Sequence, residues 1–388
     1  MQFALTDDQR AIQEAAQRFT ADKLTPHAAH WDEHHIFPRA TIRAAADLGF
    51  SAIYVSEAGG GIGLGRVEAA LIFEAMAYGC PSTSAFISIH NMAAWMIDSF
   101  GSADLKARYL PDLIAMDRLA SYCLTEPGSG SDAAALRTRA ERDGDAYIVT
   151  GSKAFISGGG ANEVYVTMVR TGGPGPAGIS ALVIDKDMPG VSFGAPERKM
   201  GWHSQPTAQV NFDGVRVPVA NRIGEEGDGF KIAMTGLDGG RLNIGACSLG
   251  GAQRCLDESL AYTRGRTQFG KAIADFQATQ FRLADMETEL QAARLLLYTA
   301  AAKVSEAAPD KTKFAAMAKR LATDTGSKVA DEALQLHGGY GYLQDYPIER
   351  FVRDLRVHRI LEGTNEIMRV IIAREMLRAA NQGGNLKE

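Results

Sequence analysis

A single carboxylate, Glu362, stands at the start of an expected helix in a context that suits acid–base chemistry. The apolar stretch 367–377 follows it, with Thr364 as a good N-cap and Glu366 in the first turn, where the helix dipole favours negative charge. Glu362 precedes the cap and lies beside Gly363, which lets backbone or a ligand approach closely. A helix start therefore explains Glu366 but not Glu362, although an isolated Glu at such a place is structural or solvated in most proteins.

A second group of polar residues, TEPGSGSD at 125–132, could hold a ligand. It offers closely spaced backbone N–H groups together with the hydroxyls of Thr125, Ser129 and Ser131. Successive N–H groups of this kind can form concave sites for anions. A polar turn without a ligand accounts for the same residues, so the segment by itself leaves both interpretations open.

Two glycine-rich strings look like phosphate-binding loops but lack features that such loops require. GRTQFGKA at 265–272 has the glycine and lysine spacing of a P-loop, yet it has no Ser or Thr for Mg²⁺ and follows a helix rather than a strand. GGGIGLG at 59–65 misses the G-x-G-x-x-G spacing and lies between expected helices. Both a P-loop enzyme and an NAD(P)-dependent dehydrogenase are therefore disfavoured.

Size and composition describe a protein with substantial cores and no nucleic-acid partner. The 388 residues exceed what one core usually holds, so two or three domains are expected. Apolar residues make up 46% of the chain, and 41 basic and 46 acidic residues are mixed along it without a basic block. No apolar run reaches the ~18 residues of a membrane span. The four cysteines show neither metal-ligand nor disulfide spacing, so we expect buried free thiols, no metal site and a reducing compartment.

The pattern of apolar residues divides the chain into three regions of an α+β multidomain fold. Residues 1–120 show helical periodicity and predict an N-terminal α-helical domain that starts at the N-cap Thr6 and continues with helical stretches at 39–48, 66–79, 90–100 and 104–116. Between 121 and 225, alternating runs separated by Gly and Pro predict a middle, mostly antiparallel β-domain. Residues 226–388 return to long helical segments, which predict a C-terminal four-helix bundle.

The polar segments, taken together and in order, resemble the acyl-CoA dehydrogenases. YCLTEPGSGSD at 122–132 and LEGTNEIMR at 361–369 are similar to the two signature regions of that family. KAFIS at 153–157, RTQFG at 266–270 and ALQLHGGYGY at 333–342 match between them. The resemblance runs over essentially the whole chain and implies the same three-domain architecture, assembled as a homotetramer that binds FAD.

Four further stretches resemble the isobutyryl-CoA dehydrogenases within the family: 86–101, 170–180, 217–224 and 353–363. This resemblance implies α,β-dehydrogenation of a short branched-chain acyl-CoA, namely isobutyryl-CoA to methacrylyl-CoA in valine degradation. Electrons would pass to an electron-transfer flavoprotein. Butyryl-CoA and 2-methylbutyryl-CoA stay alternative substrates, because one methyl group is worth only ~1 to 3 kcal/mol in a pocket.

The same resemblance assigns site residues by position, with Glu362 as the catalytic base. Arg266, Phe276, Gln277 and residues 335–339 would reach the FAD of a neighbouring subunit, and Phe155 would pack on the flavin ring. The implied FAD contacts are Tyr122, Leu124, Thr125, Gly130, Ser131, Phe155, Ile156, Ser157, Arg266, Phe269, Phe276, Gln277, Gln335, Leu336, His337, Gly338, Gly339, Thr364, Asn365 and Glu366. The implied contacts with the CoA thioester are Ser131, Asp238, Gly239, Gly240, Arg241, Gly363 and Arg374.

The chemistry sets conditions on Glu362. A free Glu has a pKa near ~4.3, which is too weak a base for a carbon acid, so burial must raise it, while the nearby helix N-terminus acts in the opposite sense. Relatives such as the isovaleryl enzymes take their base from the position that is Gly240 here, so they are poor guides to this chain. The enolate charge would be stabilised by the backbone N–H of Glu362 and a ribityl hydroxyl of FAD.

Two rival functions follow from the same resemblance. An acyl-CoA oxidase would pass the electrons to oxygen, and a silent family member would act as an assembly protein, although Glu362, Thr125 and Arg266 are all present. The N-terminus carries Asp7 and Asp8 where a signal peptide would have positive charge, so a soluble protein is expected. Its compartment would be a bacterial cytoplasm, or a mitochondrial matrix if the chain is a processed eukaryotic protein.

Overall fold

Helix α1 (Asp7–Phe19) begins where the sequence predicts it, because Thr6 and Gln9 form a capping box. The Thr6 hydroxyl accepts a hydrogen bond from the Gln9 backbone N–H (3.2 Å), and the Gln9 side chain accepts one from the Thr6 N–H (3.1 Å). The computed structural model describes residues 4–384 of the chain. The N-terminal helices that follow are α2 (Ala28–Glu33), α3 (Arg39–Ala44), α4 (Arg66–Gly79), α5 (Pro81–Phe100) and α6 (Ala103–Ile114).

The middle of the chain forms a mixed sheet, in which β1 and β2 pair in parallel with β4 and the other neighbours are antiparallel. The order of its strands is β6-β7-β3-β2-β4-β5-β8, with β1 beside β4. The bounds are β1 (Ala120–Cys123), β2 (Arg139–Asp143), β3 (Ala146–Ser157), β4 (Val164–Arg170), β5 (Ile179–Asp185), β6 (Val191–Phe193), β7 (Thr207–Pro218) and β8 (Arg222–Ile223).

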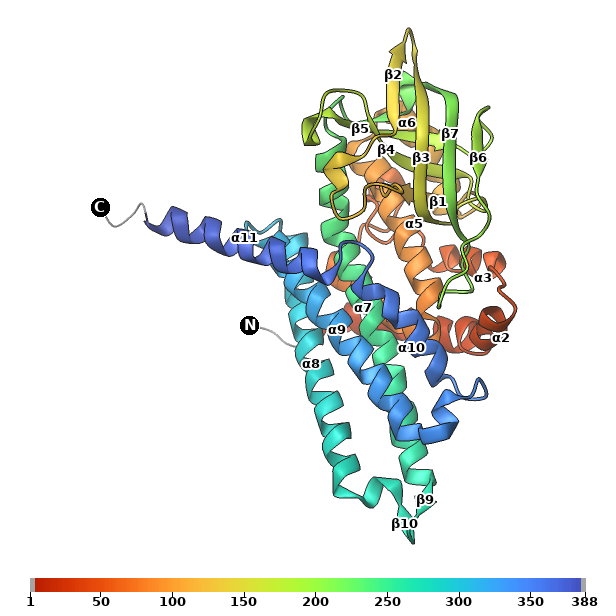
Figure 1. Cartoon of the computed structure of the whole chain (residues 1–388), viewed down its shortest axis with the longest axis vertical. Helices are drawn as coiled ribbons and strands as arrows, with labels where there is room; N and C mark the ends of the chain where they lie inside the picture. The colour runs from red at the N-terminus through yellow and green to blue at the C-terminus, as the bar shows by residue number, and fades with distance from the viewer. Residues whose placement is uncertain (1–3, 385–388) are drawn as a thin grey trace.

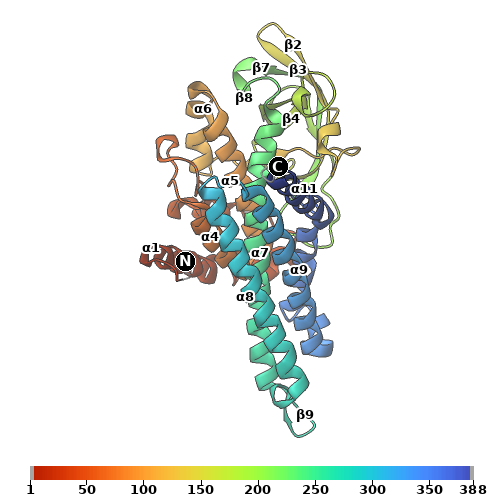
Figure 2. The same cartoon turned by 90° about the vertical axis from the view of Figure 1, so that its left-hand side faces the viewer.

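The C-terminal part is a bundle of long helices, with a small hairpin at one end and the sheet at the other (Figures 1 and 2). Helix α11 projects from the side of the molecule in Figure 1. The bounds are α7 (Gly229–Gly265), β9 (Thr267–Gln268), β10 (Lys271–Ala272), α8 (Gln277–Ser305), α9 (Lys311–His337), α10 (Ile348–Arg356) and α11 (Asn365–Gly384).

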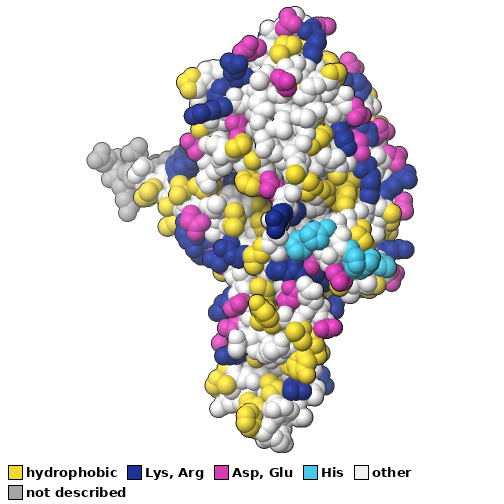
Figure 3. Space-filling model, turned by 45° about the vertical axis from the view of Figure 1, so that its right-hand side comes forward, with side chains coloured by type: hydrophobic (Ala, Val, Ile, Leu, Met, Phe, Trp, Pro, Cys, Tyr) yellow, Lys and Arg dark blue, Asp and Glu magenta, His cyan; other side chains and the backbone are white. Residues whose placement is uncertain are grey.

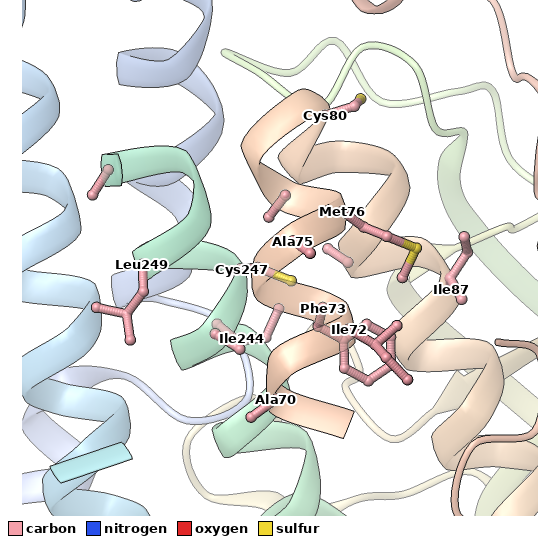
Figure 4. Close-up of a cluster of buried hydrophobic side chains, with 14 of the residues drawn as sticks. Ala70, Ile72, Phe73, Ala75, Met76, Cys80, Ile87, Ile244, Cys247 and Leu249 are labelled. Carbon is pink, nitrogen blue, oxygen red and sulfur yellow. The ribbon is translucent and has the colours of Figure 1, made fainter. Parts of the chain in front are cut away.

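Helices α4, α5 and α7 share the largest buried apolar cluster. Ile72, Phe73 and Met76 of α4 lie between Ile87 of α5 and the apolar side chains of α7 (Figure 4). Gly250 of α7 allows the close approach, because a Cβ atom there would lie 2.0 Å from the Glu74 carbonyl oxygen. The two helices are therefore held face to face by apolar burial over several turns.

Several expectations from the sequence are confirmed. The α+β fold with helical, sheet and bundle regions is present, although the sheet is mixed rather than simply antiparallel. The cysteines Cys80, Cys123, Cys247 and Cys255 are buried and free. None of the helices within residues 4–384 combines the length and apolar character that a membrane crossing requires. The domain boundaries at 120/121 and 225/226 stay a prediction.

Candidate active site

Glu362 lies in the short connection between α10 and α11, in a left-handed backbone conformation. Its φ is +54°, and Gly363 follows at +93°. A residue other than glycine rarely adopts this conformation, and such strained residues concentrate at functional sites. Thr364 then caps α11, since its hydroxyl accepts a hydrogen bond from the Ile367 N–H (3.2 Å). The predicted helix start is confirmed, and Glu362 stands just outside it.

The carboxylate of Glu362 is directed against α7 at Gly240. A Cβ atom at position 240 would lie 2.5 Å from Glu362 Oε2, 3.0 Å from Cδ and 3.1 Å from the sulfur of Met92 on α5. A side chain at position 240 would therefore compete with Glu362 for the same space. The predicted relation between positions 240 and 362, two alternative places for one base, fits this contact.

Glu362 is a partly exposed residue, but its Oε2 atom is buried and has no hydrogen-bond partner within the described part of the chain. Burial raises the pKa of Glu362 to about 7, against the opposing effects of the Lys319 and Arg241 cations. Burial thus outweighs the nearby positive charges. The carboxyl group can take up or release a proton near neutral pH, as a general base requires.

A second buried polar atom faces the same region. The hydroxyl of Tyr122, on β1, also lacks a hydrogen-bond partner among residues 4–384. Burial raises the pKa of Tyr122 above its usual value, and the charge of Glu362 adds to this effect. Buried polar atoms are usually hydrogen-bonded, so two orphans near one another indicate a place for a polar ligand.

Arg241 connects Glu362 to the predicted substrate residues on α7. Its guanidinium donates to Asp238 (2.8 Å) and approaches the Glu362 carbonyl oxygen at 3.5 Å. Asp238 in turn accepts a hydrogen bond from Thr312 on α9 (2.7 Å). The network fixes one turn of α7 beside Glu362. Arg374, on the exposed surface of α11, lies outside it and pairs with Glu375.

The predicted flavin contacts of the sheet are brought together by hydrogen bonds that join β3 to β1 and to the loop after β1. The Ala154 N–H donates to the Thr125 carbonyl oxygen (2.8 Å), and the Ser121 hydroxyl donates to the Ser157 carbonyl oxygen (2.7 Å). Leu124 and Ile156 are buried, whereas Phe155 has a φ of +58° and is 67% exposed. Gly130 and Ser131 lie on the exposed part of the loop. The sheet therefore places the apolar ring of Phe155 beside the polar backbone groups of the loop after β1.

The predicted flavin contacts from Arg266 to Gly339 lie near the hairpin, at the far end of the bundle from the sheet (Figure 1). A cavity of about 460 Å³ is lined there by Arg266 and by residues 335–340. The Arg266 guanidinium lies over the Tyr340 ring at 5.5 Å, and Phe269 meets Phe276 edge to face at 6.3 Å. Phe276 and Gln277 lead into α8. These residues do not meet Glu362 within one copy of the chain.

Residues 361–366 do not all face the same way. Asn365 is 1% exposed, and its side chain is hydrogen-bonded into α9 rather than toward the sheet. Glu366 is exposed and lies 3.5 Å from Arg369. Any cofactor contact of Asn365 would have to come from its backbone.

The residues present fit a flavin on four observations. The unpaired Tyr122 hydroxyl needs a polar partner, and the exposed Phe155 ring offers a flat apolar surface. A Cβ atom at Gly128 or Gly130 would meet nothing within 4 Å, so the loop is open to a neighbour. A cavity of about 230 Å³ also opens beside Gly128 and Ser129.

Family models match nearly the whole chain. The N-terminal domain of acyl-CoA dehydrogenases matches residues 6–117, the middle domain residues 121–215 and the C-terminal domain residues 227–377. The chain belongs to the acyl-CoA dehydrogenase family. Membership makes it an FAD-dependent oxidoreductase, and the fold and the Glu362 geometry agree with that.

Individual relatives cover almost all of the chain. Mitochondrial isobutyryl-CoA dehydrogenase of Dictyostelium discoideum is 55% identical and that of Bos taurus 53%, each over 96% of this chain and 90% of the relative. The structure of butyryl-CoA dehydrogenase from Megasphaera elsdenii superposes with a TM-score of 0.94 at 38% identity, over 97% of this chain and 100% of that one. The FAD complex of PigA superposes with a TM-score of 0.94 at 32% identity, over 97% and 99%.

Sequence reasoning missed three buried polar residues around Glu362: Lys319, Tyr54 and Arg66. The Arg66 guanidinium lies 3.7 Å from the centre of the Tyr54 ring and against Gly239. Lys319 is fully buried in α9. One signal for the burial of Lys319 was available in the sequence. Its position falls on the same helix face as Ala315, Ala318 and Ala322, which recur at helical spacing.

Proposed function

We propose that this acyl-CoA dehydrogenase oxidises isobutyryl-CoA to methacrylyl-CoA, with Glu362 as the base that removes the α-proton. The observation that carries the proposal is the buried Oε2 atom of Glu362, which has no hydrogen-bond partner among residues 4–384 and lies against Gly240, in a carboxyl group whose pKa burial raises to about 7. The identity of 55% and 53% to two isobutyryl-CoA dehydrogenases supports this substrate. The reaction would serve valine degradation.

The reaction needs a base for the α-hydrogen, stabilisation of the enolate and an acceptor for the β-hydride. Bound FAD supplies the hydride acceptor. Glu362 takes the α-proton on Oε2, the oxygen that has no hydrogen-bond partner within the described chain. The acyl chain of the bound substrate would cover this oxygen and exclude water, which keeps the pKa of the carboxyl group raised.

Enolate charge collects on the thioester oxygen. The backbone N–H of Glu362 is the proposed donor from this chain, and the left-handed conformation at 362 and 363 fixes its direction. One such donor is typically worth about 3 kcal/mol in the transition state. The Nε atom of Arg241 lies 3.5 Å from the carbonyl oxygen of Glu362, on the same connection.

We further propose contacts for FAD and CoA as the family pattern assigns them. The sheet residues Tyr122, Thr125 and Phe155 would hold the flavin ring, and Ser131 and Asp238 to Arg241 would line the thioester. The hairpin group around Arg266 would bind the FAD of a second copy, because the hairpin of β9 and β10 lies at the far end of the bundle from the start of α11, which Glu362 precedes (Figure 1). A homotetramer supplies that copy. The domain division at 120/121 and 225/226 belongs to the same proposal.

An electron-transfer flavoprotein is the proposed acceptor of the electrons. Acidic, basic and apolar side chains are interspersed over the face shown in Figure 3, without one dominant charge. The rival assignment, an acyl-CoA oxidase, differs in an observable product: it releases peroxide in air. The proposed location is a bacterial cytoplasm or a mitochondrial matrix.

A comparison of three substrates tests the acyl group. The kcat/KM values are measured for isobutyryl-CoA, 2-methylbutyryl-CoA and butyryl-CoA with an artificial electron acceptor. We expect isobutyryl-CoA to be preferred, by a factor within the roughly 10- to 200-fold that one methyl or methylene group provides. A preference for butyryl-CoA contradicts the isobutyryl assignment and leaves the family assignment intact.

A further inference from the structure

Lys319 is a fully buried lysine whose hydrogen-bonded partners lie on the connection that carries Glu362. Its ammonium donates to the carbonyl oxygen of Gly363 (2.8 Å) and to Oδ1 of Asn365 (2.9 Å). The side chain is 0% exposed and sits among alanines of α9. A buried cation is costly unless it is paired and hydrogen-bonded, so its presence calls for a reason.

Asn365 extends the attachment along α9. Its side-chain N–H₂ donates to the Thr323 hydroxyl (3.0 Å) and to Asp324 (2.9 Å), while its Oδ1 accepts from Lys319. Asn365 is 1% exposed. The residues on both sides of Thr364 are therefore tied to one face of α9 through Lys319.

Glu362 is held on its other side by α7. Arg241 approaches the Glu362 carbonyl oxygen at 3.5 Å, and Lys319 binds the next carbonyl along the chain, that of Gly363. Arg241 of α7 and Lys319 of α9 thus contact the carbonyl oxygens of two successive residues. The strained φ values of +54° and +93° at these residues persist only where the surroundings determine them.

Lys319 is also a nearby source of positive charge for Glu362. Burial lowers the pKa of Lys319 to about 8, while the charge of Glu362 acts to raise it. The other charged or titratable groups that act on Glu362 or are acted on by it are Arg241 and Cys247 of α7, Tyr122 of β1, and Tyr54 in the segment between α3 and α4. Those acting on or affected by Lys319 are Arg241, Asp324, Glu366 and His358.

We propose that Lys319 is a positioning residue for Glu362: it holds residues 362–365 against α9 so that the carboxylate faces Gly240, and its charge favours the ionised, basic form of that carboxylate. This inference rests on the proposed function of Glu362. Lys319 donates to the backbone of the connection and makes no hydrogen bond to the Glu362 carboxylate within residues 4–384.

The variants Lys319→Met, Lys319→Gln and Lys319→Arg separate holding from charge. Gln keeps a hydrogen-bond donor without the charge, Arg keeps the charge, and Met keeps neither. Lys328→Met is the matched control, because Lys328 lies on the same helix but is exposed and pairs with Glu289. The pH dependence of kcat is measured for each holoenzyme with isobutyryl-CoA.

We expect the low-pH limb of kcat to move upward by about one pH unit in Lys319→Met and Lys319→Gln, because loss of a nearby cation makes Glu362 harder to ionise. The limb of Lys319→Arg and of Lys328→Met stays within a few tenths of a unit of the wild type. The maximal kcat of Lys319→Met falls about 10- to 100-fold from misplacement of the base. Lys319→Gln loses less, because it still donates. If the low-pH limb of kcat stays in place in both Lys319→Met and Lys319→Gln, the proposal that the Lys319 charge favours the ionised form of Glu362 is overturned.

Hydrogen exchange of the holoenzymes, followed by mass spectrometry of peptides covering 360–367, provides a readout that does not depend on turnover. Faster exchange in Lys319→Met than in the wild type and Lys328→Met is expected. Unchanged exchange in a folded Lys319→Met variant, or in Lys319→Ala if Lys319→Met does not fold, overturns the holding role. If the wild type itself oxidises no acyl-CoA, the proposed function fails, and the exchange result still decides whether Lys319 holds the connection.

Discussion

At the scale of single residues, the proposed role of Glu362 as the base makes its ionisation set the working pH. Burial raises its pKa to about 7, so the carboxyl group loses its proton, and becomes a base, only as the pH rises through that value. We expect kcat/KM to fall by about tenfold per pH unit below pH 7. A pH profile with a substrate that has no titrating group in this range measures it. A flat profile between pH 5 and 7 would mean that another group is the base.

The contact between Gly240 and Glu362 gives a second test at this scale. Gly240→Ala places a Cβ atom 2.5 Å from Oε2 and 3.1 Å from the Met92 sulfur, so the carboxylate must move. A displacement of this size costs roughly 10²-fold in kcat. Gly173→Ala is the control, since a Cβ atom there meets nothing within 4 Å. Equal activity of the two variants would show that Glu362 does not need its present position.

How well the sequence predicted the site differs between these residues. Glu362 was predictable because its helix start explained Thr364 and Glu366 but not Glu362 itself, and because the motif is shared with a family. Lys319 was not, because a lysine on a helix is usually solvated, and only the packing of α9 against residues 363 and 365 buries it. Its place on an alanine-rich face of the helix indicated burial, but its contacts with residues far away in sequence left no local signal.

At the scale of elements, α2 and α10 are joined by a nearly buried ion-pair network. The Arg353 guanidinium donates to Asp32 (2.6 and 3.2 Å) and to Glu349 (2.6 and 2.8 Å), and the three side chains are 11% to 18% exposed. Because removal of Arg353 leaves two carboxylates without their cation, we expect Arg353→Met to destabilise the protein by about 3 kcal/mol.

The thermal midpoint of the holoenzyme measures this effect. Arg356→Met serves as the matched variant, since Arg356 is an exposed residue of the same helix. Its midpoint is expected to stay close to that of the wild type. A similar loss of stability in both variants would assign the effect to α10 itself rather than to the network with α2.

The elements with strong local signals were the ones predicted well. α1 begins after its capping residue Thr6, and α4 has the predicted limits 66 and 79. Helix α5 instead begins at Pro81, nine residues before the predicted 90, because its first turns are small and polar residues buried by tertiary packing. The parallel pairing of β1 with β4 joins residues more than forty positions apart, which alternation alone cannot predict.

At the scale of the whole molecule, the two groups of proposed FAD residues lie far apart in one chain (Figure 1). If both groups bind FAD as proposed, a complete site needs a second copy. We expect light scattering to give a mass four times the 41.6 kDa of the chain. Arg266→Met, which removes the cation over Tyr340, is expected to lose FAD on dilution although Glu362 is untouched. A monomer that retains FAD would contradict the shared site.

The central claim is that Glu362 removes the α-proton, and anaerobic mixing of the Glu362→Gln holoenzyme with isobutyryl-CoA tests it most directly. The amide cannot act as the base, yet it avoids the cost of a buried charge, so the variant should have a thermal midpoint at or above that of the wild type and should bind FAD and substrate normally. Loss of the oxidised flavin absorbance is expected to be about 10²- to 10⁴-fold slower than in the wild type. Flavin reduction at a near-normal rate in this variant would contradict the account.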